Sequence, residues 1–356
     1  MPFEFAAELF TGEGRPLERV TLAPDWRPAL EWVRLEGIRE GRLWAVTGDA
    51  SGEVEPIWDG SAGEPIVAAF RAVVGGVSRE IPKAYLRGLV QQASAGLVEK
   101  GLLGSGDVYR WVVTARPSAV VAARDEAEDA DLLVEEIVRP LPLAGASLDA
   151  LAAGARAAGT PAPDRSRMPV FVPQRVLDEA VALALAAHDV ETGGVLVGRL
   201  CRDGVADGDG PPALFLDVTA QIAAPHTRAE SARLTFTADT WAAVQAALTL
   251  RRRDEVMVGW WHYHPDFCRL RDCPPERRAR CPGASPFFSA EDVHLHRAIF
   301  SAGHHIGLLL SDSTPDGLAW SMYGWWQGMV SARGFHVVGQ APAGGATHAT
   351  YATTGL

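Results

Sequence analysis

The sequence has no long apolar run and no excess of positive charge, and each absence excludes a class of protein. None of its 356 residues falls in an apolar stretch of about 18, so no membrane-spanning helix is expected. The formal net charge is -11, which argues against a nucleic-acid-coating protein, because such proteins need a basic face. The N-terminus lacks a basic start followed by an apolar run. We therefore expect no secretory signal, and the predicted compartment is the cytoplasm.

Several motifs of common enzyme classes are also missing. The chain has no HExxH, no Gly-rich phosphate loop and no GxSxG, so the usual nucleotide-binding and serine-hydrolase interpretations have no support. It has only four cysteines, which a cytoplasmic environment would keep reduced. No histidine or cysteine occurs before His188. Soft metal ligands are therefore confined to the second half of the chain.

The length and composition predict two α+β domains. A hydrophobic content of 47% is enough for a buried core in each. We expect an accessory domain at residues 1–143, which would bind a substrate or a partner, and a second domain at 169–340. Residues 144–168 are rich in Ala, Gly and Pro, which predicts a linker, with a surface helix of the first domain as the alternative. Residues 341–356 are expected to form a flexible tail.

Hydrophobic periodicity predicts the elements of the second domain. Residues 174–188 have the spacing of an amphipathic helix, and 193–200 read as a buried strand. Residues 255–263 are rich in β-branched and aromatic residues, which is typical of a strand. A helix is expected over 289–301.

Two histidines lie in the segment Trp-Trp-His-Tyr-His-Pro, residues 260–265, at the end of the strand expected over 255–263. On a strand, residues two apart share a face, so His262 and His264 would present two imidazoles side by side. Pro265 would end the strand there. Neutral imidazoles on a rigid strand are good zinc ligands. An isolated pair of this kind is, however, more often structural.

Two further segments supply carboxylates. Asp292 would lie in the first turn of the helix that follows Ser289, and two histidines, one aspartate and a water make a catalytic zinc site. The Ser289 hydroxyl could donate to a developing oxyanion. Glu191 precedes a predicted strand and could serve as the proton-shuttling base. The alternative for Ser289 and Asp292 is an ordinary helix N-cap.

Taken together, this order of residues resembles the JAMM/MPN+ zinc metallopeptidase family. The shared pattern is Glu191, then His262-Tyr263-His264-Pro265, then Ser289 and Asp292, within residues 169–340. The resemblance implies an α+β domain with a curved sheet between helices. It implies zinc held by His262, His264 and Asp292, with Glu191 as general acid and base and Ser289 supporting the oxyanion. It also implies hydrolysis of bonds that follow the C-terminus of a ubiquitin-like protein.

The sequence departs from the family in one place. A shorter stretch usually separates the second histidine from the aspartate, and residues 266–284 form an insertion. This insertion contains Cys268, Cys273 and Cys281, which suggest a second, structural zinc. A set of unligated thiols in a surface loop is the alternative.

The predicted function is therefore that of a zinc isopeptidase that deconjugates or processes a ubiquitin-like protein. Bacterial proteins with an extra domain ahead of such a peptidase occur in ubiquitin-like conjugation operons, and this chain is similar to them. Activating and conjugating enzymes of such an operon would be its partners. Two alternatives are a JAMM-type peptidase that processes a sulfur carrier and a non-catalytic MPN-like scaffold.

Overall fold

The computed structural model contains both helices and strands. The residues that it describes are 3–45, 50–60, 65–118, 140–204, 211–224, 228–230, 233–278, 281, 287–314, 317–339 and 349–350. The predicted α+β class is confirmed. Within these ranges, no helix is long and apolar enough to cross a membrane.

Contacts between Cα atoms divide the chain into two compact units. The first comprises Met1–Gly37, Val46–Arg139 and Gln327–Met329. The second comprises Ile38–Ala45, Pro140–Trp326 and Val330–Leu356. The main division falls close to the predicted end of the first domain at residue 143.

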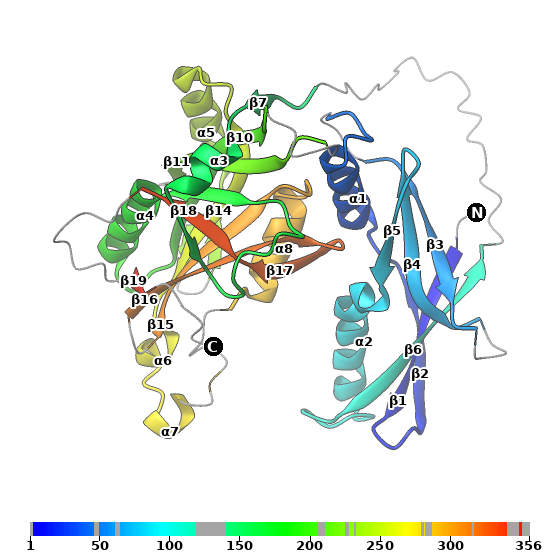
Figure 1. Ribbon diagram of the computed structural model, residues 1–356. Helices are drawn as coiled ribbons and strands as arrows, with labels where there is room; N and C mark the ends of the chain where they lie inside the picture. The colour runs from blue at the N-terminus through cyan, green and yellow to red at the C-terminus, as the bar shows by residue number, and fades with distance from the viewer. Residues whose placement is uncertain are drawn as a thin grey trace, which may run out of the picture. The chain divides into compact units, whose positions relative to one another are not determined.

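The first unit contains two three-stranded antiparallel sheets (Figure 1). Their orders are β2 (Pro16–Leu22), β1 (Phe3–Thr11), β6 (Tyr109–Pro117) and β3 (Glu53–Trp58), β4 (Val67–Val74), β5 (Val77–Pro82). The helical segments are α1 (Arg27–Arg39), η1 (Lys83–Leu86) and α2 (Arg87–Glu99). A bridge between Ile66 and Thr114 connects the two sheets.

Aromatic side chains form part of the core of the first unit. The Trp26 ring stacks on Tyr85 with the centroids 5.1 Å apart, and it also contacts Phe70 at 4.9 Å. Phe70 in turn meets Phe5 edge to face at 5.5 Å. Such contacts bury large apolar areas, so they favour a rigid unit.

The second unit is built on one sheet of eleven strands (Figure 1). The main order is β17 (Met329–Arg333), β16 (Gly317–Trp326), β15 (Ile306–Thr314), β14 (Val256–His264), β10 (Thr192–Arg202), β11 (Leu214–Ala223), β9 (Val170–Pro173), β18 (Phe335–Val338), β8 (Ala155–Ala158). In addition, β19 (Ala349–Thr350) pairs with β16 and β7 (Leu143–Gly145) with β10. A separate ladder joins β12 (Arg228–Glu230) to β13 (Arg233–Thr235).

The sheet mixes directions and curves strongly. Strand β14 is antiparallel to β10 and parallel to β15. Only Gly334 separates β17 from β18, although these strands lie near opposite ends of the order, so the sheet bends until its ends approach each other. A side chain at Gly334 would place its Cβ 2.2 Å from the backbone nitrogen of Pro163. Glycine is therefore required at this bend.

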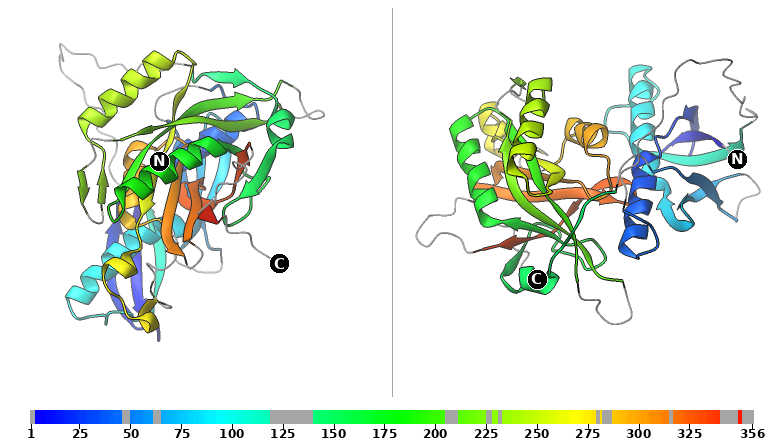
Figure 2. Two further views of the ribbon diagram at one scale, coloured as in Figure 1. Left: turned by 90° about the vertical axis from the view of Figure 1, so that its left-hand side faces the viewer. Right: turned by 90° about the horizontal axis from the view of Figure 1, so that it is seen from above.

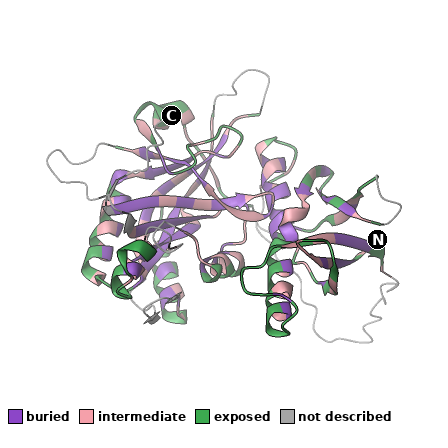
Figure 3. Ribbon diagram, turned by 90° about the horizontal axis from the view of Figure 1, so that it is seen from below, coloured by how far each residue is buried: buried purple, intermediate pink, exposed green. Residues whose placement is uncertain are grey.

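Helices cover the sheet of the second unit. They are α3 (Leu148–Ala153), α4 (Gln174–Ala187), α5 (Ala238–Arg251), α6 (Phe267–Leu270), α7 (Pro275–Arg278) and α8 (Ala290–Ile299). Helix α4 buries Val176, Leu177, Ala180 and Ala184, which share one face at helical spacing, and it packs on β9, β10 and β11. Helices α5 and α8, yellow-green and orange in Figure 2, both contribute to one apolar cluster with β10 and β14. The inner strands are largely buried, whereas the helices have an exposed face (Figure 3).

The predicted linker at 144–168 is wrong. Its residues form α3 and β8, and β8 pairs antiparallel with β18. Leu148 and Leu151 of α3 pack against a core cluster that includes Phe171 and Phe215. The composition alone could not reveal these elements, because their partners lie far away in the sequence. Of the predicted tail 341–356, only β19 belongs to the described residues, and it pairs with β16.

Candidate metal centre

The two histidines come from the end of β14, as predicted. Alternate residues of a strand share a face, and Trp260 belongs to the cluster packed under α5 and α8. His262 and His264 therefore point to the same side as Trp260, toward α8. Both side chains are buried, with exposures of 0% and 2%.

The carboxylate comes from the first turn of α8. Ser289 is the N-cap, and its Oγ accepts from the backbone N–H of Asp292 at 3.1 Å. The Asp292 side chain accepts in return from the Ser289 N–H at 2.7 Å. This reciprocal capping box fixes the carboxylate at the helix start. The N-cap interpretation and the ligand interpretation are thus compatible, because one geometry serves both.

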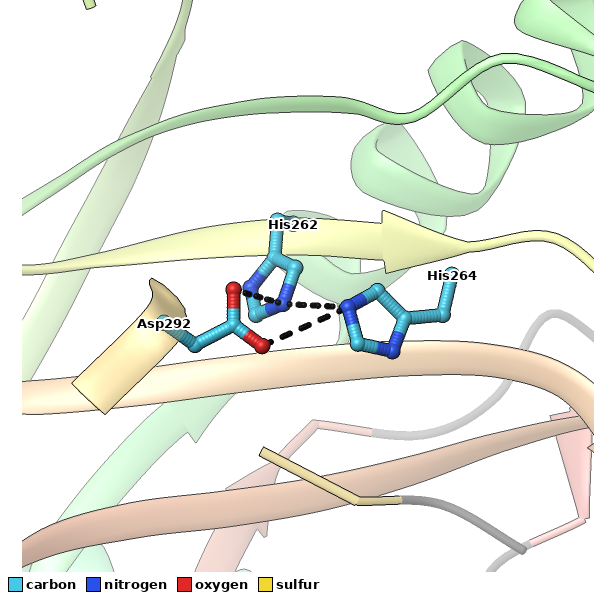
Figure 4. A group of neighbouring side chains, drawn as sticks. All are labelled: His262, His264 and Asp292. Atoms are coloured by element: carbon cyan, nitrogen blue, oxygen red, sulfur yellow. Dashed lines mark hydrogen bonds and ion pairs between the residues drawn. The ribbon is translucent and has the colours of Figure 1, made fainter. Parts of the chain in front are cut away.

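Three ligand atoms converge at this point (Figure 4). The Nε2 atoms of His262 and His264 lie 3.0 Å apart, and the Asp292 carboxylate oxygens lie 3.2 Å and 3.4 Å from them. A tetrahedral metal with bonds of about 2.0–2.2 Å separates its ligand atoms by about 3.3–3.6 Å. Among the described residues this is the only group of three or more such side chains whose ligand atoms all lie within 4.8 Å. The cluster could hold a metal ion.

The protonation states suit a cation. Burial lowers the pKa of His264 below its ordinary value of 6.5, so the imidazole is neutral at pH 7. Burial alone would raise the pKa of Asp292, but His262 and His264 outweigh it and hold that pKa well below the ordinary value. Metal binding needs neutral imidazoles and an ionised carboxylate, and His264 and Asp292 meet these requirements.

The ring nitrogens of His262 and His264 that face away from the cluster have no partner among the described residues. In the described part of the chain, Nδ1 of His262 and Nδ1 of His264 are buried without a hydrogen-bond partner. A neutral imidazole that offers its Nε2 lone pair carries its proton on Nδ1. Two facing Nε2 atoms and a carboxylate form a donor set that a divalent cation satisfies.

Glu191 lies beside this cluster. In the antiparallel ladder, Thr192 pairs with Tyr263 and Gly193 with His262, so one more step places Glu191 opposite His264. Its Oε1 lies 3.9 Å from His264 Nε2, and the residue is 4% exposed. Burial raises the pKa of Glu191 to about 7; His264 opposes this rise, and Asp292 adds to it. The carboxyl group therefore adjoins the ligand set without belonging to it.

A cavity of ≈ 280 Å³ adjoins the centre. Its lining includes Glu191, His264 and Ser289, together with Phe267, Cys268, Arg271, Cys273, Cys281, Phe287 and Glu291. All the predicted site residues except His262 and Asp292 thus face one space, and those two adjoin it through His264. A small group of a substrate could reach the cluster there.

Sequence reasoning missed how the histidines are supported. The Trp260 indole stacks on the His262 ring at 4.4 Å and donates its N–H to Nδ1 of His296 at 3.1 Å. His296 is fully buried. The spacing of four residues from Asp292 was the available signal, because residues i and i+4 share a helix face.

The cysteines approach one another at the wall of the cavity. The Cys268 thiol interacts with the thiols of Cys273 and Cys281, and Cys268 is buried. The three do not form a ligand group as tight as that of His262, His264 and Asp292. The second, structural zinc therefore stays a prediction.

Comparisons with known proteins add no functional information. No family model matches the chain, and no curated protein matches it. One similar solved structure is the solution structure of a structural-genomics target protein from Desulfitobacterium hafniense. It is 20% identical over 49% of this chain and 97% of that chain, with a TM-score of 0.32.

Proposed function

We propose that the chain is a zinc-dependent peptidase that cleaves bonds following the C-terminus of a ubiquitin-like protein. The observation that carries the proposal is the place of Glu191. Its buried carboxyl group lies 3.9 Å from His264, faces the same cavity, and adds a proton acceptor to a site that already has three ligands. Such a fourth group is what water activation requires.

Zinc is the proposed metal because of the donor set. Two imidazoles and one carboxylate, with ligand atoms 3.0 Å, 3.2 Å and 3.4 Å apart, lie slightly closer together than in a metal-bound tetrahedron and leave one position open, which is typical of catalytic zinc. When bound, such an ion supplies Lewis-acid activation of water and of a carbonyl group.

The residues of the chain would handle protons and orientation. Glu191 accepts a proton from the attacking water and passes it to the leaving amine, and a pKa raised by burial suits both halves of that transfer. The Ser289 Oγ accepts from the Asp292 N–H, so its own O–H remains available to a substrate oxygen in the cavity.

The substrate class rests on the resemblance to the JAMM/MPN+ family. The cavity wall is consistent with a peptide: Phe267 and Phe287 supply apolar surface and Arg271 supplies a positive charge. The proposed location is the cytoplasm, and the proposed partners are activating and conjugating enzymes. The first unit would orient the substrate or one of these enzymes.

The test is a cleavage assay on a ubiquitin-like fusion, with zinc content measured on the same samples. Glu191→Gln should lower turnover by at least about 10²–10⁴-fold and keep the zinc, because an amide of the same shape cannot accept a proton. Glu276→Gln, an exposed glutamate of the insertion, is the matched control and should be unaffected.

Other results would point elsewhere. Near wild-type turnover in Glu191→Gln would remove the base from the proposal, and loss of zinc would recast Glu191 as a ligand. A wild-type protein that binds a ubiquitin-like protein tightly without cleaving it would favour the scaffold. Cleavage restricted to a sulfur-carrier fusion would favour the alternative function, that of a JAMM-type peptidase that processes a sulfur carrier.

A further inference from the structure

A second cavity in the same unit is lined by basic side chains. It measures ≈ 170 Å³ and shares no lining residue with the cavity at the metal centre. Its charged or titratable lining residues are Asp164, Arg165, Arg167, Arg333 and His336. The remaining lining residues are Pro163, Pro169, Val170 and Gly334.

Arg333 is a buried cation. It is 7% exposed, its Nη2 donates to the carbonyl oxygen of Met168, and its Nε donates to that of Gly334 at 3.5 Å. In the ranges that the structure describes, it makes no ion pair. Burial lowers the pKa of Arg333 to about 9, and the like charge of Arg167 contributes. The group is thus charged at pH 7, and an uncompensated buried charge is costly.

The other two arginines differ in how they are held. Arg167 donates to the carbonyl oxygen of Ala332 and to Ser331 Oγ, both at 3.1 Å, and its guanidinium lies over the Trp326 ring at 4.8 Å. It is therefore a fixed, planar donor. Arg165 is exposed, and among the described residues it has no ion pair or hydrogen bond. It is free to close over a ligand.

The balance of charge indicates the ligand. Three arginines and one aspartate leave two positive charges in excess. Asp164 is already engaged by the N–H and hydroxyl of Ser166, at 2.8 Å and 2.6 Å. Burial lowers the pKa of His336, so it adds no charge at pH 7. A dianion would neutralise this excess, whereas a monocarboxylate would not.

We propose that this cavity binds a phosphoryl dianion, either inorganic phosphate or the phosphate monoester of a small molecule. Planar guanidinium groups match the oxygens of phosphate with paired hydrogen bonds. The geometry that carries the proposal is the buried Arg333 at the wall and the two arginines at its side. It does not depend on the proposed peptidase activity.

The experiment is calorimetric titration of the full chain with inorganic phosphate, at an ionic strength held constant with sodium chloride. One phosphate should bind per chain. Arg165→Gln and Arg167→Gln should each weaken binding about tenfold or more, because each removes a charge-assisted contact. Arg167→Lys should weaken phosphate binding less than Arg167→Gln, because lysine keeps the positive charge and loses only the paired hydrogen bonds of the planar guanidinium. Arg253→Gln, an exposed arginine outside the cavity, should bind like wild type.

Further measurements distinguish free phosphate from a phosphate monoester, and this cavity from the metal centre. Equal affinity for methyl phosphate would identify a monoester as the ligand, and much weaker affinity would identify free phosphate. Binding should persist in His262→Ala/His264→Ala, which excludes the metal centre as the phosphate site. Melting temperatures without phosphate report whether each variant is folded. The proposal is overturned if phosphate binds no better than chloride, if folded Arg165→Gln and Arg167→Gln bind like wild type, or if succinate binds more tightly.

Discussion

The indole N–H of Trp260 donates to Nδ1 of His296 over 3.1 Å, and this contact joins the strand of the metal ligands to the helix of Asp292. The hydrogen bond requires a neutral imidazole with an unprotonated Nδ1. Burial lowers the pKa of His296 to about 3, and His305 contributes. The contact therefore links the stability of the centre to pH.

Acidification should weaken the fold through His296. In the unfolded chain its pKa is near 6.5, so below that pH the unfolded state binds more protons than the folded state. The contribution of His296 to the free energy of unfolding is complete above about pH 6.5, and it falls as the pH drops toward 3. Relative to His296→Asn, which keeps an acceptor for Trp260, wild type should lose about 2 kcal/mol between about pH 7.5 and 5.

Urea unfolding at the two pH values measures this difference. The matched control is His188→Asn, because His188 is exposed and lies at the end of α4 with a φ of 55°. It shows how replacing an exposed histidine by asparagine affects unfolding under the same conditions. Parallel pH profiles for wild type and His296→Asn would contradict the assignment of a buried neutral histidine.

Metal content should depend on His262 and His264, the two histidines of β14. Wild type should hold about one zinc in the centre, and His262→Ala/His264→Ala should lose it, because Asp292 alone cannot retain the ion. His294→Ala is the control: it lies on α8 next to the centre but is exposed, and it should keep its zinc. Elemental analysis measures the zinc content of each protein. Full zinc content in the double variant would disprove the ligand assignment.

Ser289 should have two separable roles. Ser289→Ala removes the helix cap and the donor, so it should lower stability by about 0.5–2 kcal/mol and turnover by about 10²-fold or more. Ser289→Gly replaces one favourable N-cap by another and should recover most of the stability without the turnover. Thermal melts and the cleavage assay measure these together. Recovery of turnover by glycine would show that capping is the only role.

The start of the second unit can be tested by truncation. A fragment that begins at residue 169 lacks β7, α3 and β8, and it exposes the pairing edge of β18. It should be less stable than a fragment that begins at residue 140, by several kcal/mol, since Leu148 and Leu151 lose their packing. Urea unfolding compares the two. Equal stability would restore the linker interpretation.

The sequence determined the local parts of the site. Alternation along a strand sets His262 and His264 on one face, and the helix signal at Ser289 predicts where Asp292 lies. The helix α4 and the strands β10 and β14 follow from periodicity for the same reason: the information lies within one element.

Only the tertiary structure decided what joins distant segments. The register of β10 on β14 places Glu191 opposite His264, and no local pattern encodes that pairing. The same holds for β8, because its partner β18 lies near the other end of the second unit's sequence. It also holds for the arginines of the second cavity, which are brought together beside the bend at Gly334. Periodicity reports which face of an element is buried, whereas partners depend on long-range contacts that form only when the whole sheet closes.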